Sequence, residues 1–326
     1  MNKCMGCGSI LQIDPNKEGY TTNLSNKLCE RCFRIRNYND YQIIIKDNNN
    51  YLEILKNINN TNDLVVLVVD LFNINYDLIN FNKYINNNIL LVLTKADLIP
   101  SNNEEKFKNY FDRYNLNLVD RVVISSYTNY HLDELMMKIN KYRTSNKVYI
   151  VGYTNAGKST MINKLIYNYT NSSSHITTSN LPSTTLNTIE IKLDDFTIVD
   201  TPGLLDNSII NYIDSNTLKK IVPKKKIKPL TYQIKGRQTI LIDDIARIDC
   251  NDTNITFFMS NILNIKRIYK ENNLLINYKK YHLNVKNGQD IVISGLGFIK
   301  VSKDGNFDIY VIGDTEVFVR DSLIGG

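Results

Sequence analysis

The sequence predicts an α/β fold built on a mostly parallel sheet, preceded by a small cysteine-bearing module and followed by a β-rich domain. Strand-like runs alternate with helical patterns between residues 41 and 215, which is typical of a parallel sheet. Two C-x2-C pairs lie within residues 1–40, and short strand-like runs dominate residues 216–326. We therefore expect three domains with boundaries near residues 40 and 215.

The α/β elements follow from hydrophobic periodicity. Continuous apolar runs predict buried strands, and apolar residues at i, i+3, i+4 and i+7 predict helices. The expected strands cover residues 63–69, 89–93, 121–124, 147–151, 188–193 and 196–199. One expected helix carries Phe107, Tyr110, Phe111 and Tyr114 on one face, a second carries Leu132, Leu135, Met136 and Ile139, and a third covers residues 158–167.

The β-rich region is expected to contain strands at residues 238–242, 255–259, 291–293, 307–312 and 316–319. It is preceded by a cluster of lysines around two prolines, namely Lys219, Lys220, Lys224, Lys225, Lys226 and Lys228. Arginines and aromatic residues also alternate near the second cysteine pair, at Arg31, Phe33, Arg34, Arg36 and Tyr38. Each group suits RNA, although an ordinary solvated surface has the same composition.

The composition excludes several classes of protein. The 326 residues are 43% hydrophobic, with only six prolines and 14 glycines, so the chain is neither collagen-like nor dominated by linkers. No apolar run approaches the ~18 residues that span a bilayer. The N-terminus shows no secretory signal. We expect a cytoplasmic protein with no membrane partner, and its net charge of +6 permits contact with nucleic acid.

A phosphate-binding loop is encoded by Gly152-Tyr-Thr-Asn-Ala-Gly157-Lys158-Ser159, which satisfies G-x4-G-K-[ST] between an expected strand and helix. The backbone N–H groups of such a loop converge on a phosphate, and the helix adds its positive dipole end. Lys158 reaches the β- and γ-phosphates, and Ser159 offers a hydroxyl to Mg²⁺. The expected nucleotide contacts here are Gly152, Asn155, Ala156, Gly157, Lys158, Ser159 and Thr160.

A second phosphate-side motif is Asp200-Thr-Pro-Gly203, directly after an expected strand. Asp200 is expected to hold Mg²⁺, and Gly203 allows the backbone to approach the γ-phosphate. A plain turn is the alternative, and only the phosphate-binding loop argues against it. Between the two motifs, Thr185 is preferred over Thr184 as the loop threonine that ligates Mg²⁺. The expected catalytic residues are Lys158, Thr185 and Gly203.

The base is expected to be read by Thr94-Lys95-Ala96-Asp97 at the end of an earlier strand. The Asp97 carboxylate can accept hydrogen bonds from guanine N1–H and N2–H₂, a pair of donors that adenine lacks. Lys95 would lay its aliphatic stem over the base. Ser125 and Ser126 end the next strand, where a backbone N–H can donate to guanine O6. GTP and GDP are therefore the expected nucleotides.

The cysteine pairs indicate a metal site. Cys4, Cys7, Cys29 and Cys32 have the spacing of a closed, tetrahedral, structural Zn²⁺ site. A redox pair and an iron–sulfur cluster are the alternatives. The fifth cysteine, Cys250, is expected to be a buried apolar residue.

The nucleotide motifs are those of a translation-factor-type GTPase, but the base-reading motif comes first. The chain therefore looks circularly permuted, which costs little when the original termini lie close together. Its consequence is that the segment after Gly203 leads directly into the C-terminal domain.

This motif order, together with the cysteine block, resembles the YqeH family of circularly permuted GTPases. The likeness includes Leu181-Pro-Ser-Thr-Thr-Leu186, Ile227-Lys-Pro-Leu-Thr-Tyr-Gln233, Ile245-Ala-Arg-Ile-Asp249 and Ile293-Ser-Gly-Leu-Gly-Phe298. The RsgA-type GTPases fit less well, because their zinc site follows the GTPase domain. The resemblance implies a GTPase that assists assembly of the small ribosomal subunit, with that subunit or its precursor and rRNA as partners.

The chain departs from the family pattern at three positions. Thr94 replaces the usual Asn, which implies weaker guanine binding, and Ser183 replaces Gly. Leu204 stands where Ras-like enzymes carry the glutamine that orients water. In similar proteins an asparagine at the position of Asn155 helps to hold K⁺, so we expect slow, K⁺-stimulated hydrolysis. Alternatively, Asn155 only braces the loop.

The leading interpretation is a GTPase switch that binds a small-subunit precursor in one nucleotide state and leaves in the other. Thr185 and Gly203 would sense the γ-phosphate, and residues 204–221 would pass the signal on. A second interpretation is a GTP-dependent RNA- or protein-binding module with negligible hydrolysis. A third is a membrane- or replication-linked GTPase. The sequence assigns no oligomeric state.

Overall fold

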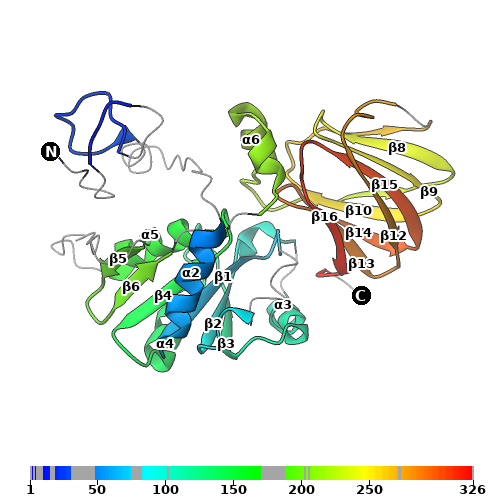
Figure 1. The fold of residues 1–326 in the computed structure, drawn as a ribbon. Helices are drawn as coiled ribbons and strands as arrows, with labels where there is room; N and C mark the ends of the chain where they lie inside the picture. The colour runs from blue at the N-terminus through cyan, green and yellow to red at the C-terminus, as the bar shows by residue number, and fades with distance from the viewer. Residues whose placement is uncertain are drawn as a thin grey trace.

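The computed structural model describes residues 2, 4, 10–14, 19–30, 48–74, 83–100, 103–169, 188–201, 203–204, 206–270 and 273–324. Figure 1 shows an α/β body, a β-rich body that follows it, and the N-terminal residues apart from both sheets. Within the described residues no helix has the length and apolar character needed to span a membrane.

The α/β body contains a six-stranded sheet in the order β3-β2-β1-β4-β6-β5. Its strands are β1 (Leu64–Asp70), β2 (Ile89–Thr94), β3 (Leu118–Val123), β4 (Lys147–Gly152), β5 (Ile189–Lys192) and β6 (Thr197–Asp200). Neighbouring strands pair in parallel except β5, which runs antiparallel to β6. The prediction of a mostly parallel sheet is therefore confirmed.

Both faces of this sheet are covered, which explains the continuous apolar run of β1. Val65 and Leu67 pack on one side with residues of α2 (Asn48–Asn59) and α3 (Glu104–Asn109). Val66 and Val68 pack on the other side with residues of α4 (Leu132–Tyr142) and α5 (Lys158–Tyr169). A strand that is buried on both faces shows no polar alternation.

The predicted aromatic helix face is present, but the helix is shorter than expected. Phe107, Tyr110, Phe111 and Tyr114 are all buried in one core. The α-helix α3 nevertheless ends at Asn109, and a 3₁₀ turn, η3 (Tyr110–Arg113), continues the chain. The rings therefore share a face through a tightened turn rather than through a continuous α-helix.

The β-rich body consists of two five-stranded antiparallel sheets that enclose one core. One sheet has the order β16-β13-β14-β10-β7 and the other β11-β8-β9-β15-β12. The strands are β7 (Leu230–Gln233), β8 (Arg237–Ile242), β9 (Ala246–Asn251), β10 (Asn254–Met259), β11 (Ile265–Ile268), β12 (Lys279–Val285), β13 (Gln289–Ile293), β14 (Gly297–Lys303), β15 (Gly305–Val311) and β16 (Val317–Asp321). We call this body the C-terminal sandwich. As expected, Cys250 is buried in it.

The C-terminal sandwich packs directly against the α/β body. Phe258 and Phe298 belong to the same buried cluster as Phe72, which follows β1. The connecting segment contains η4 (Ile209–Tyr212) and α6 (Ser215–Ile221), and its residues Ile209 and Ile221 are buried in the sandwich core. The connection is therefore a packed part of the structure and not an exposed tether.

Candidate nucleotide-binding site

The sheet topology brings the predicted nucleotide motifs to one edge. Strands β2, β3, β4 and β6 run parallel, so their carboxyl ends meet at the same side of the sheet. Each expected motif begins at or just after the end of one of these strands. This edge is where open α/β sheets bind their ligands.

The phosphate-binding loop lies between β4 and α5, as the sequence predicts. Gly152 ends the strand, and a Cβ there would lie only 2.4 Å from the backbone oxygen of Val68. Asn155 and Gly157 both have a positive φ, at 61° and 91°, so the loop turns through two left-handed residues. The loop therefore turns back on itself, as a loop that surrounds a phosphate does. Ser159 and Thr160 lie in the first turn of α5.

Lys158 points back over this loop. Its ammonium group donates to the carbonyl of Gly152 at 3.1 Å and to that of Tyr153 at 3.4 Å, and the residue is buried. Burial lowers the pKa of Lys158, and the negative charge of Asp200 opposes this shift. Among the described residues this buried ammonium donates to carbonyls and pairs with no carboxylate, so it is well placed to receive an anion.

The second phosphate-side motif meets the loop directly. A Cβ on Gly203 would lie 2.9 Å from the Cγ2 of Thr154 and 3.0 Å from both the backbone nitrogen of Thr154 and the Nζ of Lys158, so a side chain there would require these neighbours to move. The next residue, Leu204, donates its N–H to the carbonyl of Gly152 at 3.1 Å and accepts from Thr154 N–H at 2.8 Å. The structure therefore unites Gly203 with Lys158, although they lie far apart in sequence.

Asp200 has the environment of a metal ligand. Its Oδ1 is buried and has no hydrogen-bond partner among the described residues. Burial raises the pKa of its carboxyl to about 6, and the positive charge of Lys158 opposes this rise. A buried carboxylate oxygen that the protein leaves unpaired fits a hard cation such as Mg²⁺.

The base-reading motif touches the phosphate loop. The hydroxyl of Thr94 donates to the carbonyl of Ala156 at 2.6 Å, across 62 residues of sequence. A Cβ on Gly157 would lie 3.4 Å from the same hydroxyl oxygen. Thr94 therefore braces the phosphate loop through a short side chain that reaches its backbone.

The following residues form a second contact with the sheet edge. Lys95 has φ 63°, and its ammonium group lies 2.6 Å from Oδ2 of Asp70 at the end of β1. Ala96 donates its N–H to the carbonyl of Ile124 at 3.2 Å, which joins this loop to the loop after β3. Asp97, within η2 (Ala96–Leu98), is partly exposed.

The loop after β3 is closed on itself. Ser125 and Tyr130 exchange backbone hydrogen bonds of 3.2 and 3.0 Å, and the Ser125 hydroxyl accepts from Thr128 N–H at 3.2 Å. Ser125 and Ser126 are both buried. The expected guanine-facing backbone is thus held in a small closed loop.

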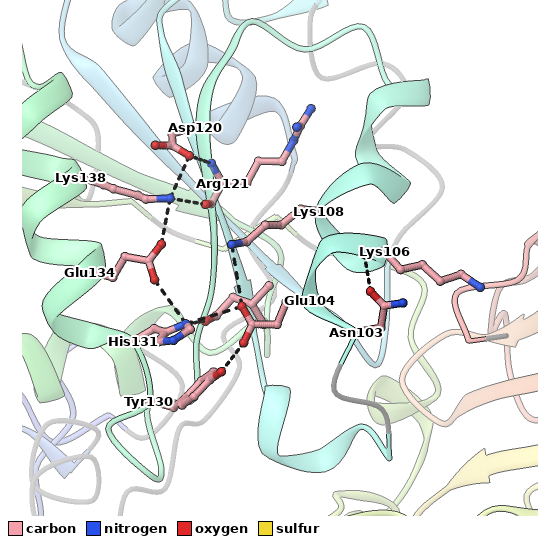
Figure 2. Close-up of polar contacts among 11 residues, drawn as sticks. Asn103, Glu104, Lys106, Lys108, Asp120, Arg121, Tyr130, His131, Glu134 and Lys138 are labelled. Carbon is pink, nitrogen blue, oxygen red and sulfur yellow. Dashed lines mark hydrogen bonds and ion pairs between the residues drawn. The ribbon is translucent and has the colours of Figure 1, made fainter.

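Figure 2 shows the polar network that anchors this loop to two helices. The Tyr130 hydroxyl donates to Glu104 of α3, and the Tyr130 ring stacks on His131 with centroids 3.8 Å apart. The Nδ1 of His131 lies 3.7 Å from Glu104 and 3.4 Å from Glu134, and Lys138 pairs with Glu134 at 3.0 Å. The sequence analysis did not predict this network, because Glu104 lies 26 residues before Tyr130 along the chain.

Some predicted residues fall outside the described part of the chain. These are Ser183, Thr184 and Thr185 on the phosphate side, Cys7 and Cys32 of the cysteine block, and the group of arginines and aromatic residues Arg31, Phe33, Arg34, Arg36 and Tyr38. In the described part of that block, Cys4 and Cys29 are both buried beside Leu11. The N–H of Cys29 donates to the Sγ of Cys4 at 3.1 Å, which brings the first cysteine of each C-x2-C pair together. Within the described residues, no three His, Cys, Asp or Glu side chains are grouped as a metal site.

The sequence analysis also missed Asp70 as a site residue. Its signal was present, since a carboxylate ends an otherwise apolar strand at the edge that carries the other motifs. Asp70 is 5% exposed and pairs with Lys95, so it supports the loop that the sequence predicts to read the base.

The fold and the motifs define the class, which is a phosphate-loop GTPase domain. Residues 147–244 match the family model described as "50S ribosome-binding GTPase". The chain belongs to the YqeH family: it is 35% identical to YqeH of Bacillus subtilis over 98% of its own length and 99% of that protein. The resemblance expected from the sequence is thereby confirmed.

Two other relatives match shorter stretches. The small ribosomal subunit biogenesis GTPase RsgA of Clostridium beijerinckii is 30% identical over 49% of this chain and 55% of its own length. The GTPase Der of Herpetosiphon aurantiacus is 29% identical over 41% of this chain and 31% of its own.

The pKa of Asp200 makes a testable prediction about Mg²⁺. With a pKa of about 6, the carboxyl is mostly ionised at pH 7 and mostly protonated at pH 5, so protons compete with the metal. We expect the Mg²⁺ concentration that half-saturates GDP binding to rise about tenfold from pH 7 to pH 5. Equilibrium titration with a fluorescent GDP analogue measures this shift.

The variant Asp200→Asn is the control, because the phosphates of the nucleotide also titrate in this range. It should need more Mg²⁺ at pH 7 and lose most of the pH dependence. A tenfold shift that persists in this variant would show that Asp200 is not the competing group.

Proposed function

We propose that this protein is a circularly permuted GTPase switch that binds and hydrolyses GTP and assists assembly of the small ribosomal subunit. One observation carries the nucleotide part of the proposal. The hydroxyl of Thr94 contacts the phosphate loop at Ala156, so a base-reading loop encoded early lies beside a phosphate loop encoded later. In the permuted chain the segment after Gly203 continues into the C-terminal sandwich.

The proposed roles follow the geometry. Lys158 neutralises the phosphates, Ser159 and Asp200 hold Mg²⁺, and Gly203 gives the γ-phosphate access to the backbone. When bound there, Mg²⁺ would offset the negative charge that develops on the phosphate oxygens. Thr185 is proposed as the further Mg²⁺ ligand from its place in the sequence. Asp97 reads the guanine edge, and Ser125 and Ser126 complete the base pocket.

We propose that the segment after Gly203 transmits the presence or absence of the γ-phosphate to the sandwich. Glu316 donates its N–H to Asn207 at 2.8 Å, and Ile209 donates to Ser294 at 2.9 Å, so this segment is bonded to the sandwich. A change of position at Gly203 on hydrolysis would therefore reach the sandwich through four to six residues of chain. We propose domain boundaries near residues 40 and 215, with residues 216–326, which include the lysine-rich segment and the sandwich, as the RNA-binding part.

The proposal of a ribosomal partner rests on the family and on charge. The name of RsgA refers to small-subunit biogenesis, whereas the family description of residues 147–244 refers to the 50S subunit. The lysines of the segment before β7 are all exposed, at Lys219, Lys220, Lys224, Lys225, Lys226 and Lys228. An exposed run of cations suits a phosphate backbone such as that of rRNA.

Co-sedimentation with purified ribosomal subunits tests this function. We expect the protein to pellet with small subunits in the presence of a non-hydrolysable GTP analogue, and at least tenfold less with GDP or with large subunits. Binding should weaken steeply with added salt if lysines contact rRNA. Equal binding in both nucleotide states would contradict the switch, and preference for large subunits would contradict the choice of subunit.

A second candidate function is a GTP-dependent RNA- or protein-binding module with negligible hydrolysis. Leu204 favours it, because its backbone is bonded to the phosphate loop and its side chain packs against the apolar core. This residue cannot orient a water molecule. If hydrolysis is physiological, we propose that K⁺ held by Asn155, an exposed residue of the phosphate loop with a left-handed backbone, supplies the missing charge.

Turnover measurements separate the two functions. We expect slow GTP hydrolysis that is at least fivefold faster in K⁺ than in Na⁺ and faster still with small subunits. Asn155→Gly keeps the left-handed backbone accessible and removes only the side chain, so it should abolish the K⁺ effect while GDP binding persists. Equal rates in both salts would eliminate the K⁺ proposal, and no turnover with subunits would favour the binding module.

We also propose a structural Zn²⁺ site at Cys4, Cys7, Cys29 and Cys32. An N–H donor to the Sγ of Cys4 is the kind of contact that stabilises a metal-bound thiolate. Zn²⁺ would then hold together an N-terminal module whose described core consists of very few apolar side chains.

Elemental analysis tests the metal. We expect about one Zn²⁺ per chain after purification in metal-free buffer, with the metal lost in Cys4→Ser. The matched control, Cys250→Ser, changes a cysteine in the sandwich core and should retain the metal. Zinc well below one equivalent in the unmodified protein, or iron in its place, would refute the assignment.

A further inference from the structure

The turn at residues 294–296 joins β13 to β14 and is part of a motif whose role the proposed switch leaves unexplained. It sits between the sandwich and the α/β body. Gly295 has φ 79°, and a Cβ there would lie 1.9 Å from the Oγ of Ser208. Glycine at this position therefore allows the turn to approach the connecting segment at Ser208 closely. We call residues 294–296 the docking turn.

The docking turn is seated on the segment that follows β1. The N–H of Gly295 donates to the Oδ1 of Asn73 at 3.3 Å. Just beyond the turn, the ring of Phe298 lies edge-on to Phe72, with centroids 6.0 Å apart. A Cβ on Gly297 would lie 2.9 Å from the same Phe72 ring. Two consecutive residues after β1 thus form the seat for the sandwich.

Asp70 fixes that seat. Its Oδ1 accepts the N–H of Phe72 at 2.8 Å, and its backbone oxygen accepts the N–H of Asn73 at 3.1 Å. Its other carboxylate oxygen, Oδ2, binds the ammonium group of Lys95 at 2.6 Å. One buried carboxylate therefore holds the base-reading lysine with one oxygen and the seat of the docking turn with the other.

A second contact ties the base-reading loop to the C-terminal half of the chain. The N–H of Ile227, which lies within the lysine-rich segment, donates to the carbonyl of Leu98 at 2.9 Å. Ile227 is buried in the same core as Leu98. The loop that carries Asp97 is therefore held on both sides, by Asp70 and by Ile227.

We propose that Asp70 is a positioning residue for Lys95, and that it couples occupancy of the guanine pocket to docking of the C-terminal sandwich. The inference rests on the proposed assignment of Thr94–Asp97 as the base reader. The sandwich then responds to the base through the docking turn and to the γ-phosphate through the segment after Gly203. Because coupling between sites is reciprocal, docking of the sandwich also strengthens guanine nucleotide binding.

The test compares Asp70→Asn with Asp63→Asn at the other end of β1. Asp63 accepts a hydrogen bond from the Ser145 hydroxyl at 2.5 Å and is part of neither contact. We expect Asp70→Asn to weaken GDP binding about tenfold, the effect of losing one charge-assisted hydrogen bond. Binding of Mg²⁺-tripolyphosphate, which has no base, should not change. Asp63→Asn should bind both as the unmodified protein does.

Amide hydrogen exchange measures whether the docking turn stays bonded to its seat. In the unmodified protein and in Asp63→Asn, GDP should slow exchange of the Gly295 amide, whereas tripolyphosphate should not. In Asp70→Asn the slowing by GDP should disappear. If Asp70→Asn does not fold, Asn73→Ala provides the same test, since it removes only the acceptor for Gly295. It should lose the slowing and weaken GDP binding less than Asp70→Asn.

Three outcomes overturn the inference. GDP affinity that is unchanged in Asp70→Asn removes the positioning role. An equal loss of tripolyphosphate binding shows that Asp70 supports the fold in general. If GDP does not change the exchange rate of the Gly295 amide in the unmodified protein, the proposed coupling is wrong. Failure of the base-reader assignment is a separate result, because it would appear as unchanged GDP affinity in Asp97→Ala.

Discussion

The hydrogen bond from the Thr94 hydroxyl to the Ala156 carbonyl joins the two halves of the nucleotide site. The side chain of Thr94 is shorter than that of asparagine and still makes this bond, because the backbone of the phosphate loop at Ala156 and Gly157 lies close to Thr94. The bond holds the phosphate loop at a fixed distance from the base-reading loop. The strands that carry the two loops, β2 and β4, are separated by β1. Without this hydrogen bond, the relative position of the two loops would depend on loop conformation.

The site contains two buried charged groups, Lys158 and Asp200, whose charges the protein only partly compensates. Burial lowers the pKa of Lys158 and raises that of Asp200, and each of these groups is the other's main charged influence. Separate partners, phosphate for the ammonium and Mg²⁺ for the carboxylate, would satisfy both groups better than they satisfy each other. The free site is therefore organised to favour the metal–nucleotide complex.

The fold was predictable where burial leaves a clear pattern. β1 and β2 are buried along their whole lengths, and the sequence predicted both within one residue at each end. β9 was missed because Arg247 and Asp249 interrupt its apolar run. Their ion pair is buried, and the Asp249 carboxylate also accepts from the Thr239 hydroxyl of β8 at 2.6 Å. The ion pair lies within β9 itself, and the cross-strand hydrogen bond that supports it is invisible until the strands are paired.

The sequence by itself determined the chemistry, because the residue types and spacing around Lys158, Asp200 and Asp97 are set by the nucleotide and are local in the chain. Only the tertiary structure decided which distant groups support them. Asp70 beside Lys95 and Gly295 beside Asn73 are products of strand order and domain packing. The physical reason is that a short-range contact between residues far apart in sequence leaves no periodicity or spacing along the chain.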